Sequence, residues 1–134
     1  MPATIVLTLT FLALLLMVCS RVFAVARKKV KPGYFKIYQN KSDVEIPDRV
    51  LRFGRHFQNL VEIPPIFYFV CLVAIHFKQE ESVELWAWVF AVSRVLHSLV
   101  HITVNHILLR MLTFTVSCLA LFFMWSIIIG KVFL

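Results

Sequence analysis

The chain has 134 residues, of which 60% are hydrophobic and 16% charged, and its formal net charge is +7. Soluble domains carry roughly 45–50% apolar and about 25% charged residues, and a chain this short cannot bury so much apolar surface in a water-soluble core. The composition excludes an ordinary soluble domain and predicts a polytopic membrane protein. The basic residues concentrate in one loop, which favours a role in membrane orientation over nucleic-acid binding.

Residues 3–26 form the first apolar run. At about 1.5 Å per residue it is long enough to cross a hydrocarbon core of roughly 30 Å. A basic cluster that begins at Arg27 ends the run. A cleaved signal peptide is the competing interpretation, but no Lys or Arg precedes the run, which also exceeds the length of a typical signal. We therefore predict a first transmembrane helix.

The second helix is predicted over residues 47–77. The polar loop before it contains turn signals at Pro32 and in residues 40–43. Pro64 and Pro65 lie inside the helix, where each lacks an N–H and presses on the carbonyl four residues earlier. We expect a kink there, which either serves packing alone or widens a polar cavity.

Residues 78–84 are interpreted as a short acidic loop. The third helix is predicted over 84–105 and the fourth over 107–130, with a tight connection between them. The predicted fold is an all-α integral membrane protein, in which residues 1–134 form a single domain of four transmembrane helices.

Charge asymmetry predicts the orientation of the chain. Residues 27–55 contain nine Lys or Arg and three acids, whereas residues 78–84 contain one Lys and three Glu. The positive-inside rule places the first loop in the cytoplasm and both termini on the opposite side. Short loops and no retention signal favour a bacterial inner membrane.

Polar residues of the second helix are spaced three and four apart and therefore share one face. They are Arg52, Arg55, Asn59 and Glu62. This face carries the Glu62 carboxylate into the hydrocarbon, where an ionisable group is costly and marks a candidate functional site.

The third helix carries Arg94, His97 and His101 on one face, and Arg110 lies near the start of the fourth. All of them fall in or near the cytoplasmic half of the predicted span. We expect Glu62 to pair with Arg94 or His97.

These residue types suit a small zwitterionic thiol. A permanent cation such as Arg110 can hold a thiolate, Arg52 or Arg55 can bind a carboxylate through a planar fork, and Glu62 can receive an ammonium group. Three alternatives stay open: a structural ion-pair network, a proton or ion path through His97 and His101, and a metal site. The metal site is the weakest, because Glu62 is the only plausible third ligand, so no metal is expected.

The residue pattern of the predicted helix over residues 47–77 resembles that of the MAPEG family. These are the membrane-associated proteins in eicosanoid and glutathione metabolism, which include the microsomal glutathione transferases. The pattern is Arg55-x-x-x-Asn59-x-x-Glu62-x-x-Pro65, followed by Phe67. The four-span layout and the long basic first loop agree with this resemblance over essentially the whole chain.

The predicted helices over residues 84–105 and 107–130 extend the resemblance. Arg94 and His97 match a pair in the third transmembrane helix of the family, and Arg110 matches the arginine credited with stabilising the glutathione thiolate. The chain departs from its relatives at His101 and Phe114, where several of them carry Tyr, and a phenylalanine cannot donate a hydrogen bond.

The resemblance implies a homotrimer that binds glutathione as co-substrate in a cytoplasm-facing cleft between subunits. A lipophilic small molecule would arrive from the membrane lipids. The expected glutathione-binding residues are Arg52, Arg55, Asn59, Glu62, Arg94, His97 and His101, with Arg110 activating the thiol.

The resemblance implies a glutathione-dependent transferase or peroxidase. The alternative, motivated by the missing tyrosines, is a non-catalytic membrane trimer that binds a lipid or a membrane-protein partner. Whether the chain is an enzyme is thus left open.

Overall fold

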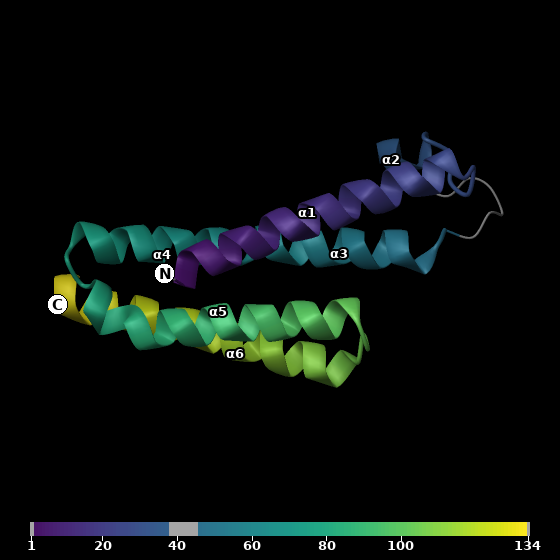
Figure 1. Ribbon diagram of the computed structural model, residues 1–134. Coiled ribbons are helices and arrows are strands. Elements are labelled where there is room, and N and C mark those ends of the chain that lie inside the picture. The colour runs from purple at the N-terminus through teal and green to yellow at the C-terminus, as the bar shows by residue number, and fades with distance from the viewer. Residues whose placement is uncertain (1, 38–45, 134) are drawn as a thin grey trace.

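The computed structural model describes residues 2–37 and 46–133, and all regular elements within them are helices (Figure 1). Helix α1 spans Pro2–Ala26, α2 Tyr34–Ile37, α3 Asp48–Glu62, α4 Pro64–His76, α5 Glu80–Ile102 and α6 Ile107–Ile128, and a π-helical segment η1 covers Ile129–Phe133. In this part of the chain four helices are long and apolar enough to cross a membrane, with α3 and α4 together forming one of them. The predicted all-α, four-span fold is confirmed. The turn expected at residues 40–43 lies outside the described residues.

Helix α1 buries only a narrow stripe of its surface. The buried residues are Val6, Ala13, Met17 and Ala24, which are seven, four and seven positions apart and so share one face of the helix. Most leucines and both phenylalanines of α1 are exposed. An apolar exterior of this kind is expected of a span surrounded by lipid, because lipid tails are as apolar as the side chains.

The second span consists of two helices rather than one. Helix α3 ends at Glu62, and α4 begins at Pro64 after a bend at Ile63. Pro64 and Pro65 supply no N–H, so Ile66 is the first residue after the break whose N–H returns to a carbonyl, that of Ile63 at 3.1 Å. The expected kink is therefore a helix break.

Helix α5 begins four residues earlier than the predicted residue 84. Glu80 and Glu81, assigned to a loop in the sequence-based prediction, form its first turn. Carboxylates are favourable there because they face the positive end of the helix dipole. The helix ends at Ile102 instead of residue 105, and Asn105 turns the chain with a φ of 51°.

Stacked aromatic rings hold the apolar half of the bundle together. Phe67 of α4 and Phe90 of α5 have no exposed surface, and their ring centroids are 4.1 Å apart. Trp86 of α5 stacks on Phe123 of α6 at 4.4 Å. These contacts lie on the side of the helix break away from the polar residues.

Both chain ends lie at the same end of the bundle (Figure 1). The α4–α5 turn is at that end too, whereas α2, the beginning of α3 and the α5–α6 turn lie at the opposite end. Polar residues near the beginning of α3, the end of α5 and the beginning of α6 therefore meet at one end of the molecule.

Candidate functional site

A guanidinium group links α5 to α3 in the interior of the bundle. The Nη2 atom of Arg94 donates to the carbonyl oxygen of Asn59 at 2.9 Å and to its side-chain Oδ1 at 2.5 Å. Arg94 has no exposed surface. Because its charge is permanent and burial of an unsatisfied charge is expensive, Asn59 acts as its principal hydrogen-bond acceptor.

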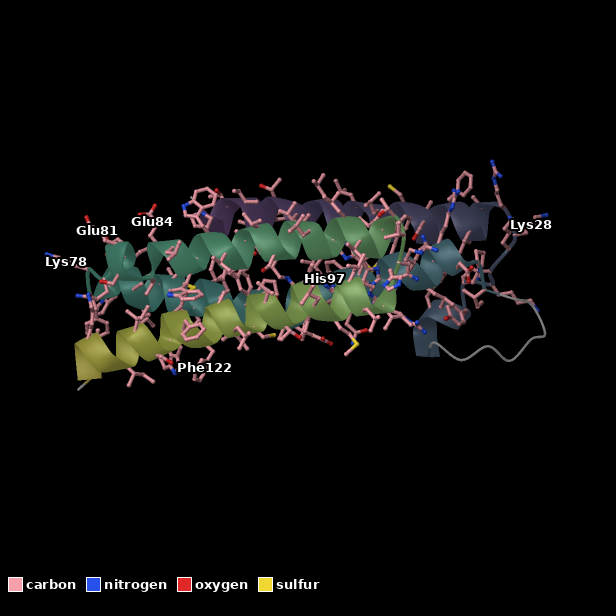
Figure 2. The ribbon with its side chains drawn as sticks, turned by 90° about the horizontal axis from the view of Figure 1, so that it is seen from below. Lys28, Lys78, Glu81, Glu84, His97 and Phe122 are labelled. Atoms are coloured by element: carbon pink, nitrogen blue, oxygen red, sulfur yellow. The ribbon has the colours of Figure 1, made fainter. Side chains whose placement is uncertain are left out.

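His97 links the same helix to α6. Its Nδ1 lies 3.1 Å from the carbonyl oxygen of Arg110 and 3.2 Å from Oγ1 of Thr113. A carbonyl oxygen can only accept, so this contact calls for a protonated Nδ1. Figure 2 shows His97 inside the bundle, among nitrogen-bearing side chains that extend toward the Lys28 end.

Two further arginines surround the α5–α6 turn. Arg52 Nη1 donates to the carbonyl oxygens of Ile102 at 3.3 Å and Thr103 at 3.5 Å. These carbonyls end α5, where a cation also complements the helix dipole. Arg110 Nη1 donates to Asn105 Oδ1 at 2.9 Å. Residues from the beginning of α3 and of α6 are thereby joined to one turn.

The expected pairing of Glu62 with Arg94 or His97 is wrong for the single chain. Glu62 is exposed, and its Oε1 accepts a hydrogen bond from Gln58 Nε2 at 2.8 Å on the same helix. The reason is geometric. Arg94 reaches α3 at Asn59, which is half-buried, whereas Glu62, about one turn further along the same face, lies at its exposed edge.

His56 is a site residue that the sequence-based reasoning missed. It is 1% exposed, as is His101, and the two ring centroids are 5.1 Å apart. The rings of His97 and His101 are 5.9 Å apart. His56 lies between Arg52 and Asn59 at spacings of four and three, so the helical period that selected Arg55 could also have selected it.

A polar cavity of about 180 Å³ opens beside His101. Its polar lining residues are Asp48, Arg52, Arg55, His101, Asn105 and Arg110. Three guanidinium groups against one carboxylate make this cavity suited to an anionic ligand.

A larger cavity of about 470 Å³ lies between α1, α2 and α3. Its walls are mostly apolar and include Met17, Phe35 and Phe57, and Arg55 lines it as well as the smaller cavity. Arg55 is exposed, so its guanidinium stands between a charged cavity and an apolar one.

The expected residues therefore separate into two sets. Arg55 and Glu62 face outward, whereas Arg94, His97 and His101 are buried. Asn59 touches the buried set through Arg94, and Arg110 lies partly buried at the cavity. Over the described ranges no group of three His, Cys, Asp or Glu is arranged to hold a metal ion.

Phe114 covers the buried arginine. Its ring centroid lies 5.9 Å from Cζ of Arg94 and 6.1 Å from the ring centroid of His97. A ring face at this distance attracts a cation. The phenyl ring stabilises Arg94 but supplies no hydroxyl to the site.

Comparison with known proteins gives one family. The model of the MAPEG family matches residues 5–130. No curated protein matches the chain. No solved structure matches it either.

Proposed function

Because the chain belongs to the MAPEG family, we propose that it binds glutathione as co-substrate and uses the thiolate for conjugation or peroxide reduction of a lipophilic compound. Membership alone suggests a role in glutathione or eicosanoid metabolism. The observation that carries the narrower proposal is that Arg55 of α3 and Arg110 of α6 line the same cavity. Two cations on different helices can then engage two anionic groups of one ligand.

The ligand's charged groups have matching partners in the chain. Arg55 offers a planar fork for a carboxylate. Glu62, one helical turn from Asn59 and exposed, offers a carboxylate for the ammonium group. Arg110 remains for the sulfur, and its charge stabilises the thiolate relative to the thiol.

The reaction follows from this assignment. The thiol loses its proton to solvent, and the thiolate held beside Arg110 attacks an electrophilic carbon, whose leaving group departs with the bonding electrons. With a hydroperoxide, two glutathione molecules are oxidised to the disulfide while the peroxide is reduced to an alcohol and water. Arg110 acts electrostatically in both cases and forms no covalent bond.

We further propose that the cleft is completed by neighbouring copies in a homotrimer. The outward position of Arg55, Gln58 and Glu62 supports this, because a single chain leaves these residues exposed at the level of the span. In this arrangement the protein lies in a bacterial inner membrane with its basic first loop on the cytoplasmic side, and the lipophilic substrate enters from the lipid.

Equilibrium binding of glutathione to purified protein tests the proposal. We expect saturable binding to the wild type and at least tenfold weaker binding to Arg55→Ala, because a charge-assisted carboxylate contact is lost. Arg49→Ala is the matched control, since Arg49 is exposed on the same helix but lines neither cavity described above. Absence of binding to the wild type would overturn the proposal.

A second candidate is a non-catalytic trimer that binds a lipid or another membrane protein. Phe114 favours it, because no hydroxyl is available from that position to orient a bound sulfur. Turnover with a hydrophobic electrophile separates the two candidates. Conjugation above the uncatalysed rate, abolished by Arg110→Ala, supports the enzyme, whereas tight lipid binding without any conjugation supports the second candidate.

A further inference from the structure

Four basic side chains form a buried group inside the bundle, which we call the buried basic cluster. It consists of His56 of α3 and of Arg94, His97 and His101 of α5. Their exposed fractions are 1%, 0%, 2% and 1%, in that order. The cluster lies behind the polar cavity, and His101 belongs to both.

Most polar atoms of the cluster lack a hydrogen-bond partner among the described residues. These atoms are Nε and Nη1 of Arg94, Nε2 of His97 and both ring nitrogens of His56 and of His101. Buried polar groups in proteins are almost always satisfied, and an unsatisfied one is costly in a membrane-spanning region, where no water is available to bond it. A ligand that can satisfy several donors at once would remove this cost.

The charges around the cluster identify the kind of ligand. Arg52 and Arg55 approach from α3 and Arg110 from α6, and all three line the adjoining cavity. Among the described residues the nearby carboxylates do not compensate: Asp48 is exposed and lines the cavity, and Glu62 is exposed and bonded to Gln58. One buried guanidinium group, with three more guanidinium groups at the adjoining cavity, disfavours a cation and favours an anion.

We propose that the buried basic cluster binds a small monovalent inorganic anion of the chloride or nitrate class. The anion neutralises Arg94, which Asn59 satisfies only through neutral oxygens. The site does not depend on glutathione, so it can hold even if the peptide does not bind. The cavity of about 180 Å³ reaches the cluster at His101, which lines it, and this volume exceeds the roughly 10–15 Å³ that a water-sized ligand requires.

Chloride binding to the purified protein in detergent, without glutathione, tests the proposal. The readouts are the chloride-35 resonance line width and the melting temperature in sodium chloride against sodium gluconate at equal ionic strength. We expect saturable line broadening that bromide and nitrate reverse, and a melting temperature that rises with chloride in the same concentration range.

The matched variants are His56→Phe and His101→Phe, which keep an aromatic ring while removing the nitrogens. We expect each to weaken chloride binding at least tenfold, and His76→Phe, an exposed position at the far end of the span, to bind as the wild type. Size-exclusion chromatography checks that the variants fold, and the wild-type titration tests the proposal even if they do not.

Two results would overturn the proposal. The first is a wild-type protein without saturable line broadening. The second is displacement of chloride by stoichiometric glutathione, which would assign the cluster to the peptide. Retention of chloride binding with the peptide bound supports a separate anion site.

Discussion

Arg94 donates to the carbonyl oxygen of Asn59 at 2.9 Å and to the Asn59 side chain, so that a permanent charge of α5 is held against α3 by neutral oxygens. On α3 the contact lies between the exposed residues Arg55 and Glu62, and on α5 it lies one turn from the buried His97. It sets the relative position of the two helices that carry most of the candidate site.

Asn59→Ala removes the side-chain oxygen that accepts from Arg94 and leaves only the backbone carbonyl. Hydrogen bonds to charged groups contribute roughly 1.5–3 kcal/mol, so we expect the free energy of unfolding to fall by about 2 kcal/mol. Thermal unfolding in detergent measures the change. Ser126→Ala is the control, because Ser126 is exposed and bonds only to its own helix. An unchanged melting temperature for Asn59→Ala would contradict this role.

Glu62→Gln should leave the stability of the single chain almost unchanged, because the exposed carboxylate contacts only Gln58 in the part of the chain described by the structure. Glutathione binding should nevertheless fall by at least tenfold, since the amide no longer carries a charge for the ammonium group. Calorimetric titration and chromatographic mass measurement give both quantities. Loss of the oligomer with no change in glutathione binding would instead support the non-catalytic trimer.

Phe90→Ala tests the packing of the apolar half of the bundle. Phe90 has no exposed surface and stacks on Phe67 at 4.1 Å. Truncating a buried phenylalanine removes dispersion contacts and leaves a cavity, and we expect a loss of about 3 kcal/mol. The control is Phe122→Ala, whose ring is 64% exposed and should be nearly neutral. Equal effects of the two variants would be inconsistent with this core.

Arg52→Ala should loosen the end of α5. The guanidinium donates to the carbonyls of Ile102 at 3.3 Å and Thr103 at 3.5 Å, and because these bonds are long and partly exposed we expect them to contribute only roughly 0.5–1.5 kcal/mol. Amide hydrogen exchange at Thr103 and Asn105 should therefore accelerate about threefold to tenfold, with Arg49→Ala as the control. Unchanged exchange at these amides would show that Arg52 does not hold the turn.

The fold followed from the sequence because hydropathy and helix length are local properties. The beginning of α5 was placed too late, since Glu80 and Glu81 were interpreted as loop residues although carboxylates stabilise a first helical turn. A kink was expected from Pro64 and Pro65, whose effect on the backbone is also local, and the structure has a helix break at Ile63 in its place.

The candidate site was less accessible from the sequence. Helical spacing identified which residues share a face but not which neighbour that face meets. Asn59 and Glu62 were placed together, yet only Asn59 reaches Arg94, because the contact depends on the rotation of α3 relative to α5. His56 was passed over because the helical spacing was followed through Arg55, although His56 stands at equally helical spacings from Arg52 and Asn59.

The central claim, a glutathione thiolate held beside Arg110, is tested most directly by ultraviolet difference spectroscopy on adding glutathione to purified protein. The wild type and Arg49→Ala should show a stoichiometric thiolate absorbance at neutral pH, because the Arg110 charge favours the ionised sulfur. Arg110→Ala should bind glutathione with its thiol protonated and show no such band. A wild-type protein that gives no thiolate signal at saturating glutathione, or a signal of equal size in Arg110→Ala, would contradict the account.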